Sequence, residues 1–271
     1  MSDLRVTIAG AGGRMGAANI RALLQTPGLV LHSAFDRPGS PNIGRDAGEA
    51  AGVGTTGILI GDDPETALAG SGAIIDFTAP AVSVMLAERA AALGLVDIIG
   101  TTGCSKDEDW AIQKAAAAGA RIVKTGNFSL GVNILEGLVR QAARALPKNY
   151  DIEIVEMHHN RKVDAPSGTA LMLGRAAAAG REVDFDSAAV LSREGHTGAR
   201  VPGSIGFAAL RGGAVIGDHT VMFVGDTERI EITHKAQDRG MFAAGAVQAA
   251  LWAKDQPPGF YTMADVLGFK E

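Results

Sequence analysis

The sequence predicts an α/β protein in two parts: a doubly wound parallel sheet, and a second α+β domain with an open, mixed sheet. Three observations lead to this prediction. Short apolar strands alternate with helices of about 10–15 residues over the first half of the chain. These strands are near-continuous apolar runs, as expected for a parallel sheet that is covered on both faces. After about residue 127 the strands alternate polar and apolar residues, which indicates a sheet with one solvent-exposed face.

Each element of the first half has a local reason. The stretch Arg5-Val6-Thr7-Ile8-Ala9 is β-branched and apolar and stops at a glycine, which predicts a strand. Apolar residues at helical spacing predict a helix over 14–25. The alternation then continues along the chain. Further strands are predicted at 30–35, 58–60, 73–77, 96–99 and 120–123, and further helices at 64–68, 82–93 and 107–118.

The second half is predicted from a different pattern. Strands are expected at 151–157, 221–224 and 229–233, and helices at 132–146 and 243–252. The glycine-rich segment 195–217 is expected to consist mainly of loops. The last apolar helix is expected to pack back on the first domain.

Composition limits the classes of function. With 271 residues the chain can form one large domain or two, and its 46% apolar and 20% charged residues are typical of a soluble protein with a substantial core. The formal net charge of −5 argues against a general nucleic-acid binder. The single cysteine, Cys104, cannot form an internal disulfide, so a reducing compartment is expected. No secretion signal or apolar run of membrane-spanning length is found, and we expect a cytoplasmic protein with no membrane partner.

A glycine loop follows the first predicted strand and opens the first predicted helix. The segment Gly10-Ala11-Gly12-Gly13-Arg14-Met15-Gly16 is a variant of the dinucleotide fingerprint of Rossmann-type folds. Its glycines allow a tight turn and a close approach of a pyrophosphate to the helix N-terminus. The alternative is a glycine-rich turn that binds nothing, but the strand–loop–helix context favours a cofactor site.

Three charged residues bear on which dinucleotide binds. Asp36 ends the second strand 20 residues after Gly16, where its carboxylate can accept hydrogen bonds from the ribose hydroxyls of NAD. Arg37 and Arg14 can instead attract the extra phosphate of NADP. The preference stays open, and we expect NAD with tolerance of NADP.

Later strand ends add candidate contacts for the nicotinamide end, because ligands of doubly wound sheets lie outside the carboxyl ends of the strands. Thr101 and Thr102, within Gly100-Thr101-Thr102-Gly103, offer hydroxyl and amide groups. The alternative is ordinary capping of the next helix by threonine. Thr125-Gly126-Asn127-Phe128 ends the next strand and suits a small-residue hinge that holds the carboxamide.

A histidine segment near the middle of the chain carries most of the functional information. His158 and His159 are adjacent, Lys162 follows three residues later, and a Pro-Ser-Gly-Thr turn leads to Gly168 and Thr169 at the start of an apolar run. In an extended backbone the two histidines point to opposite faces, so one suits proton transfer and the other binding. Lys162 offers a cation, and the helix start offers free N–H groups for a carboxylate.

Two other interpretations of this segment remain. It can be a solvated basic loop in which Asp164 and Ser167 only cap a helix. A metal site formed by Glu156, His158 and His159 is disfavoured, since adjacent histidines on opposite faces are poor joint ligands, and we expect no metal.

The segment Glu156-x-His158-His159-x-x-Lys162-x-Asp164-x-Pro166-Ser167-Gly168-Thr169 closely resembles the signature of the 4-hydroxy-tetrahydrodipicolinate reductase family, also called dihydrodipicolinate reductase, of lysine and diaminopimelate biosynthesis. Further collinear segments that resemble this family span essentially the whole chain: 10–16, 100–103, 127–129, 131–133, 192–198 and 232–236. Cys104 and Lys124-Thr125-Gly126 depart from the usual pattern, and both lie on the cofactor side.

The resemblance implies an NADH- and/or NADPH-dependent oxidoreductase that reduces 4-hydroxy-tetrahydrodipicolinate, a small dicarboxylate, to tetrahydrodipicolinate. It implies a dinucleotide-binding domain of residues 1–127 and 239–271, and a substrate-binding and oligomerisation domain of residues 128–238 that assembles a homotetramer. His158 and Lys162 would be catalytic, and His159, Gly168 and Thr169 would bind substrate. The implied cofactor-binding residues are Gly10, Ala11, Gly12, Gly13, Arg14, Met15, Asp36, Arg37, Gly100, Thr101, Thr102, Thr125, Gly126, Asn127 and Phe128.

Two rival functions remain. An aldehyde-type dehydrogenase would use Cys104 as its nucleophile, although Cys104 lies in the cofactor half with no nearby histidine in the sequence. A regulator would bind NAD(H) without turnover, although no DNA-binding helix or basic surface is apparent.

Overall fold

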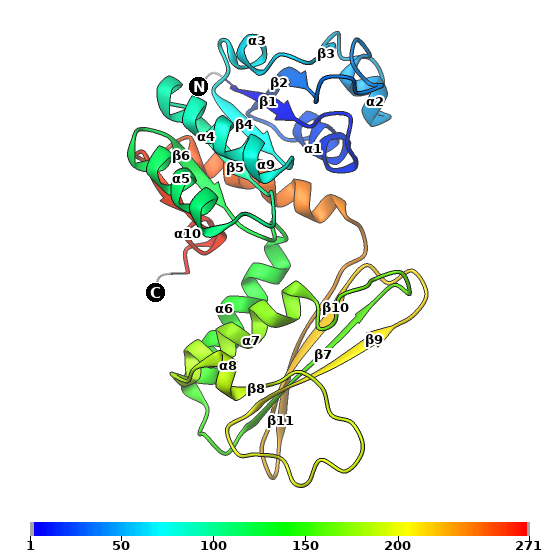
Figure 1. The fold of residues 1–271 in the computed structure, drawn as a ribbon, viewed down its shortest axis with the longest axis vertical. Helices are drawn as coiled ribbons and strands as arrows, with labels where there is room; N and C mark the ends of the chain where they lie inside the picture. Colours follow the sequence, from blue (N-terminus) through cyan, green and yellow to red (C-terminus); the bar gives the residue numbers. More distant parts are fainter. Residues whose placement is uncertain (1–2, 270–271) are drawn as a thin grey trace. The chain divides into compact units, whose positions relative to one another are not determined.

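The computed structural model describes residues 3–269. The chain forms two compact units, which are described separately here (Figure 1). Unit 1 consists of Met1–Leu130 and Gly240–Glu271, and unit 2 of Gly131–Arg239. Within the described residues, no helix is long and apolar enough to cross a membrane.

Unit 1 contains a seven-stranded sheet in which every strand pair is parallel. Its order is β12-β6-β5-β4-β1-β2-β3, so the chain leaves β1 in one direction and later returns to add strands on its other side. The strands are β1 (Leu4–Ala9), β2 (Leu29–Phe35), β3 (Ile60–Gly61), β4 (Ala73–Asp76), β5 (Val96–Ile99), β6 (Arg121–Lys124) and β12 (Gly259–Tyr261). A reversal of strand order next to β1 is the topological switch point at which such sheets bind ligands.

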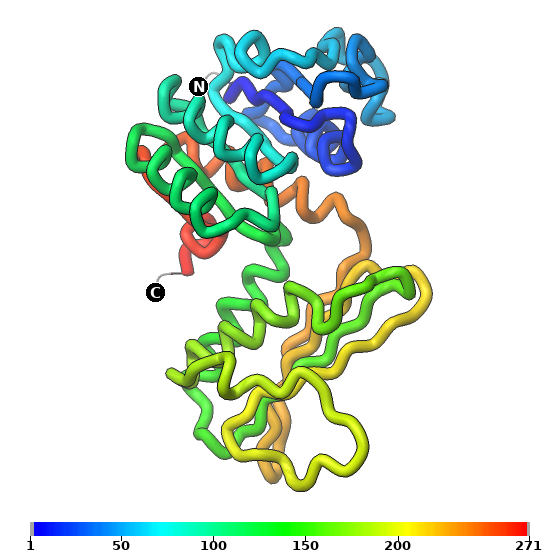
Figure 2. The backbone as a smooth tube through the Cα atoms, in the orientation of Figure 1, coloured from blue at the N-terminus to red at the C-terminus, as the bar shows by residue number. Residues whose placement is uncertain are grey.

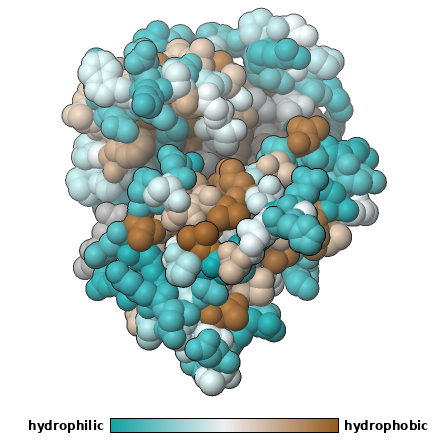
Figure 3. Space-filling view, turned by 60° about the horizontal axis from the view of Figure 1, so that its bottom comes forward, coloured by the Kyte–Doolittle hydropathy of each residue, from teal (hydrophilic) through white to brown (hydrophobic). Residues whose placement is uncertain are grey.

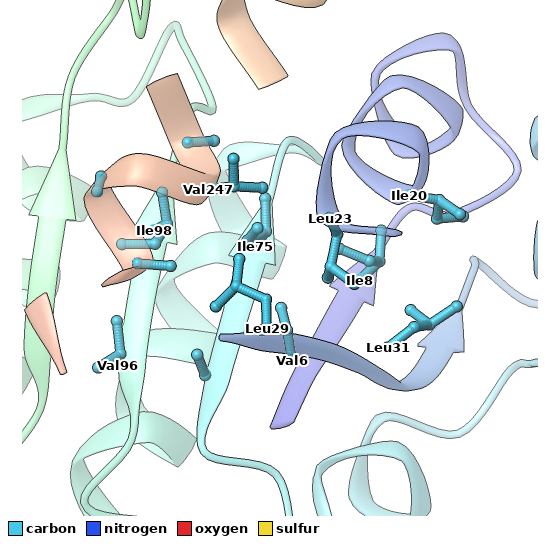
Figure 4. Packing of buried hydrophobic residues seen from close by; sticks show 14 of the residues in the cluster. Val6, Ile8, Ile20, Leu23, Leu29, Leu31, Ile75, Val96, Ile98 and Val247 are labelled. Atoms are coloured by element: carbon cyan, nitrogen blue, oxygen red, sulfur yellow. The ribbon is translucent and has the colours of Figure 1, made fainter. Parts of the chain in front are cut away.

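Helices cover both faces of this sheet. One face carries α1 (Arg14–Leu24), α2 (Ala47–Ala51), α9 (Gly240–Ala253) and α10 (Met263–Leu267), and the other carries α3 (Pro64–Leu68), α4 (Pro80–Leu93) and α5 (Lys106–Ala117). Figure 4 shows the first core, in which Val6 and Ile8 of β1 lie among Leu23, Ile75 and Val247. The sheet is therefore doubly wound, which confirms the predicted fold class of this half.

Unit 2 is built on a five-stranded mixed sheet of order β11-β10-β7-β9-β8. Its strands are β7 (Asp151–His158), β8 (Ala189–Val190), β9 (Ile205–Arg211), β10 (Asp218–Val224) and β11 (Arg229–Lys235), and its helices are α6 (Leu130–Ala145), α7 (Gly168–Arg181) and α8 (Phe185–Ala188). The strands β7, β9 and β8 run parallel, whereas β10 is antiparallel to both β7 and β11. The smooth tube of Figure 2 shows this succession without the ribbon detail.

One face of this sheet is packed and the other is not. Every second residue of β7 is buried, beginning with Ile152 and Ile154, and these residues share a core with α6 and α7. Because side chains alternate along a strand, the intervening residues of β7 point to the opposite face. This arrangement confirms the predicted α+β character and open, mixed sheet of the second half.

Some predicted elements were wrong in extent. The segment 195–217, expected to be mainly loop, contains β9, which pairs with β7 along seven residues. Gly206 of β9 pairs with Glu153 of β7. An added Cβ at Gly206 would be 2.1 Å from Glu153 Oε2, so the glycine here reflects close contact with a neighbouring strand and not a loop. The strand expected at 58–60 is only β3, and β12, which was not predicted, pairs with β6 after the proline break.

Candidate active site

The glycine loop of unit 1 forms a tight turn between β1 and α1. Gly10 adopts a left-handed conformation, with φ of +68°, and its carbonyl accepts a hydrogen bond of 3.0 Å from the N–H of Gly13. A Cβ at Gly16 would lie 2.2 Å from the Gly10 oxygen, so only glycine allows this close helix–strand packing. Gly13 is the N-cap of α1 and, as a glycine, has no side chain to cap the first N–H groups of this 11-residue helix.

Asp36 lies beside this loop, as the sequence predicted for a ribose-binding acid. A Cβ at Gly12 would be 2.3 Å from Asp36 Oδ2, so the loop leaves room for this carboxylate only because position 12 is glycine. Ser40 Oγ and the Arg37 backbone N–H donate to the carboxylate at 2.7 and 2.8 Å. A tight glycine turn, an uncapped helix start and an adjacent acid together fit a dinucleotide at this edge of the sheet.

The ends of β4 and β5 are joined by a buried polar cluster. Asp76 accepts hydrogen bonds from the backbone N–H of Thr78 at 2.9 Å and from the hydroxyl of Ser83. The Thr101 hydroxyl accepts from the Thr78 N–H at 3.0 Å and lies 3.5 Å from Asp76. Burial raises the pKa of Asp76. Thr101 is thus committed to holding two strand ends together, whereas Thr102 is exposed.

The Thr125–Phe128 segment is also locally ordered. The Thr125 hydroxyl accepts from the Asn127 N–H at 3.2 Å, and Asn127 Oδ1 accepts from the Ser129 N–H at 2.8 Å. The ring of Phe128 is buried and lies 5.6 Å from that of Phe77 at the end of β4. The segment therefore lies at the same strand-end region as Phe77, while Gly126 has open space beside it.

Cys104 does not have the environment of a nucleophile. It is partly buried and packs against the core between the sheet and helices α4 and α5. Burial is the main cause that raises the pKa of its thiol. A reactive cysteine needs a lowered pKa, so the structure disfavours the aldehyde-dehydrogenase alternative.

The histidine segment of unit 2 is organised around Glu156. Glu156 and His158 both lie on the helix-facing side of β7, and the Glu156 side chain is only 1% exposed. Its carboxylate accepts from His158 Nδ1 at 2.6 Å, from both Nη atoms of Arg211 at 2.8 Å, and from the Ser167 N–H at 3.1 Å. Burial opposes ionisation, but the Arg211 and His158 hydrogen bonds outweigh it and hold the pKa of Glu156 below its usual value.

A second histidine, His219, lies beside this group. Its Nε2 is 3.0 Å from Ser167 Oγ, and its ring meets that of His158 edge-on at 5.1 Å. Burial and the neighbouring His158 lower the pKa of His219 to about 4, so His219 is neutral near pH 7. Ser167 also accepts from the Ala170 N–H at 3.1 Å as the N-cap of α7, which ties the helix start to the histidine pair.

The other residues predicted to bind substrate lie just before α7 in the sequence or in its first turn. His159 follows β7, donates its N–H to the Val215 carbonyl at 2.7 Å, and has a buried Nδ1 with no hydrogen-bond partner in the described part of the chain. Lys162 is paired with Asp164 at 2.8 Å, a contact that lowers the pKa of Asp164. Gly168 and Thr169 form the first turn of α7, and the space beside Gly168 is open.

Sequence reasoning missed part of this arrangement. Arg211 and His219 were not singled out, and Glu156 was considered only as a metal ligand. In the described part of the chain, no group of three His, Cys, Asp or Glu side chains is arranged to hold a metal ion. A buried acid two residues before a histidine on the same strand face was the available signal, because an apolar face tolerates such an acid only with partners.

Comparisons with known proteins match the chain along both units. Family models for the dihydrodipicolinate reductase N-terminus and C-terminus match residues 4–128 and 131–267. A 4-hydroxy-tetrahydrodipicolinate reductase of Rhizobium rhizogenes is 57% identical, covering 99% of this chain and 98% of the relative. The enzyme of the same name from Agrobacterium fabrum is 56% identical, covering 100% of this chain and 98% of the relative.

Solved structures agree in fold. A dipicolinate-bound dihydrodipicolinate reductase from Paenisporosarcina sp. TG-14 aligns with a TM-score of 0.77 at 20% identity, covering 96% of this chain and 97% of that one. GenD2 of gentamicin A biosynthesis, solved with NAD, aligns with a TM-score of 0.60 at 14% identity, covering 100% of this chain and 88% of that one. The two family models and the full-length relatives show that the chain belongs to the dihydrodipicolinate reductase family.

Proposed function

We propose that this protein is an NAD(P)H-dependent reductase that converts 4-hydroxy-tetrahydrodipicolinate to tetrahydrodipicolinate in lysine and diaminopimelate biosynthesis. The observation that carries the proposal is the family membership over the whole chain, at up to 57% identity to reductases of this name among the relatives compared. The site geometry supports the proposal, because one segment of unit 2 contains His158, which is hydrogen-bonded to Glu156, together with Lys162 and the start of α7.

Unit 1 is the proposed cofactor-binding domain. Its glycine loop and the start of α1 suit the pyrophosphate, and Asp36 suits the adenosine ribose. NAD(P)H, when bound, supplies the hydride. The proposed contact residues are Gly10, Ala11, Gly12, Gly13, Arg14, Met15, Asp36, Arg37, Gly100, Thr101, Thr102, Thr125, Gly126, Asn127 and Phe128. For Thr101 the proposed contact is its backbone, since its hydroxyl is engaged at the strand ends.

The choice between NADH and NADPH depends on three charged residues. The Asp36 carboxylate, beside Gly12, favours ribose hydroxyls and would repel a phosphate. Arg37 and Arg14 favour the phosphate of NADPH. We propose NADH as the preferred cofactor, with NADPH tolerated.

Unit 2 is the proposed substrate-binding domain. The substrate is a dicarboxylate, and the relative from Paenisporosarcina was solved with dipicolinate bound. Lys162, His159 and the first turn of α7 at Gly168 and Thr169 are the proposed anion-binding groups, since a cation and a helix N-terminus both stabilise negative charge. Asp164 neutralises Lys162 in the structure, so binding a carboxylate would require Lys162 to exchange partners.

His158 is the proposed proton donor. Hydride addition to the unsaturated ring leaves an enamine that needs a proton, and an imidazole near its working pH can deliver one. The Glu156 carboxylate, 2.6 Å from His158 Nδ1, holds the ring in its orientation. Lys162 is the proposed second proton source at this site.

The open face of the unit 2 sheet supports the proposed homotetramer. Val155, Met157 and Met222 alternate with core residues on β7 and β10 and are only partly buried, while Leu210 of β9 is exposed. A second subunit would bury this apolar surface. Figure 3, which draws one side of the molecule, shows small hydrophobic groups between hydrophilic ones.

We propose a cytoplasmic location on the basis of the single, unpaired cysteine and the biosynthetic role.

The test is NADH oxidation in the presence of the product of dihydrodipicolinate synthase, generated in the cuvette. We expect the near-ultraviolet absorbance of NADH to fall only when that product is supplied. NADH binding without absorbance loss would contradict the reductase proposal and favour a sensor. Replacing NADH by NADPH in the same assay measures the cofactor preference.

A further inference from the structure

We propose that Glu156 is a positioning residue for proton transfer: its carboxylate, fixed by Arg211 and Ser167, holds the His158 proton on Nδ1 and leaves Nε2 as the nitrogen that exchanges protons. This inference rests on the proposed reductase function and adds to it a residue pair, Glu156 and Arg211, and a defined tautomer.

The Glu156 carboxylate is fixed in position. Arg211 grips both of its oxygens at 2.8 Å, and the Ser167 N–H adds a third anchor at 3.1 Å. Arg211 is held in turn, because it donates to the Asp164 carbonyl at 2.7 Å and to the Leu210 carbonyl at 2.6 Å. A planar guanidinium on two oxygens fixes the plane of the carboxylate as well as its place.

The hydrogen bond between Glu156 and His158 has a defined direction. An ionised carboxylate only accepts, so His158 Nδ1 at 2.6 Å must donate. In the neutral ring the single N–H is then on Nδ1, and Nε2 carries the lone pair. In the charged ring Nε2–H is the proton that can leave.

A glycine, Gly217, lies beside Nε2 of His158. A Cβ added to Gly217 would lie 3.0 Å from His158 Nε2, which is closer than ordinary contact. Glycine at this position keeps that side of the ring clear for a reacting group. The neighbouring His219 directs its Nε2 to Ser167 and not to Glu156, so it does not compete for the carboxylate.

The proton step then balances simply. After hydride addition, the bond between Nε2 and its hydrogen breaks as a carbon–hydrogen bond forms on the enamine. His158 becomes neutral and keeps its Nδ1–H on Glu156, and solvent later restores the Nε2 proton. The carboxylate stays ionised throughout and orients the ring, as in other acid–histidine pairs.

Glu156→Gln tests the tautomer directly. The amide has one oxygen, and the backbone N–H of Ser167 can only donate, so the oxygen is expected to stay on that side. The NH2 group then faces His158 and favours the ring form with its proton on Nε2. We expect turnover to fall by about 100-fold or more, with NADH affinity unchanged, because a misplaced acid loses most of its catalytic contribution.

The readout is the ring nitrogen chemical shifts of protein labelled with 15N-histidine, with the His158 signals assigned by their loss in His158→Gln. Wild type should show a protonated Nδ1, and Glu156→Gln a protonated Nε2. This readout needs no turnover. A wild-type Nδ1–H form without reductase activity would therefore refute the proposed function and leave the positioning claim standing.

Two glycine variants provide a matched pair that leaves Glu156 in place. In Gly217→Ala the methyl group meets Nε2, and turnover should fall while the His158 tautomer is unchanged. In Gly212→Ala the methyl group meets only the flexible end of Met157, also at 3.0 Å, and turnover should stay near wild type. A neutral wild-type ring with its proton on Nε2 and not on Nδ1, or Glu156→Gln or Gly217→Ala with wild-type turnover, would overturn the proposal.

Discussion

A buried acid in unit 1, Asp97, should destabilise the folded protein, and replacing it by valine should raise stability. Asp97 lies in the middle of β5 and is fully buried, and neither of its carboxyl oxygens has a hydrogen-bond partner among residues 3–269. Its neighbours across the sheet are Ile74 on β4 and Ile122 on β6, both members of the α4–α5 side of the core. A β-branched apolar side chain suits this position better than a carboxyl group.

The expected gain follows from this environment. Leaving a buried polar group without partners costs about 1–3 kcal/mol. Valine adds apolar burial at about 0.8 kcal/mol per carbon group. Together these give about 3 kcal/mol for Asp97→Val. For a domain of this size, that corresponds to a rise in melting temperature of about 6–12 °C.

The effect should depend on pH with a defined sign. Burial, and then the nearby Asp76, raise the pKa of Asp97 well above its usual value. The folded state therefore binds the Asp97 proton more tightly than the unfolded state does. The stability that this protonation contributes is complete below about pH 4 and is lost as the pH rises toward the pKa of Asp97 in the folded state. Asp97→Asn has the same shape and does not titrate, so its advantage over wild type should grow from about pH 4 to pH 8.

Tryptophan fluorescence during thermal unfolding is the assay. The two tryptophans of the chain, Trp110 and Trp252, both belong to unit 1, so the signal reports on the unit that contains Asp97. A valine variant that melts at or below the wild-type temperature would show that the buried Asp97 carboxyl group does not destabilise unit 1. A difference between wild type and Asp97→Asn that is constant across this pH range would contradict the raised pKa of Asp97.

Three further predictions concern the site. Gly16→Ala should weaken NADH binding measured by calorimetry, because its Cβ would lie 2.2 Å from the Gly10 oxygen, whereas Gly61→Ala, with open space around it, should bind normally; equal affinities would argue against the glycine-loop account. Cys104→Ala should retain full turnover in the coupled assay, since burial raises the pKa of its thiol, and an inactive but folded variant would restore the nucleophile alternative. Lys162→Ala should raise the KM for the substrate about 10–100-fold, the value of a charge-assisted hydrogen bond, without changing NADH affinity; an unchanged KM would remove Lys162 from carboxylate binding.

The strands β1, β2, β4, β5 and β6 of unit 1 were predictable because their apolar runs are continuous and each is followed by a helical pattern. The segment Val96–Ile99 was predicted correctly despite its central aspartate, because the flanking residues kept the apolar character. The strand β9 was missed because Gly206 and the surrounding glycines suggested a loop. Its glycine reflects a tertiary contact with Glu153, which no local pattern reveals.

The site divides in the same way. The glycine loop and Asp36 follow from local spacing, since a strand, a turn and a helix determine their proximity. The pairing of Glu156 with Arg211 joins residues 55 positions apart in the sequence. It depends on the parallel register of β7 and β9, in which His158 lies opposite Arg211, and that register was not predictable from either strand alone.

The turnover of His158→Gln, with NADH affinity measured on the same preparation, tests whether His158 transfers the proton. We expect turnover to fall by about 10²–10⁴-fold, the contribution of a well-placed acid, with NADH binding nearly unchanged. Wild-type turnover in a folded His158→Gln protein would contradict the assignment of proton transfer to this histidine.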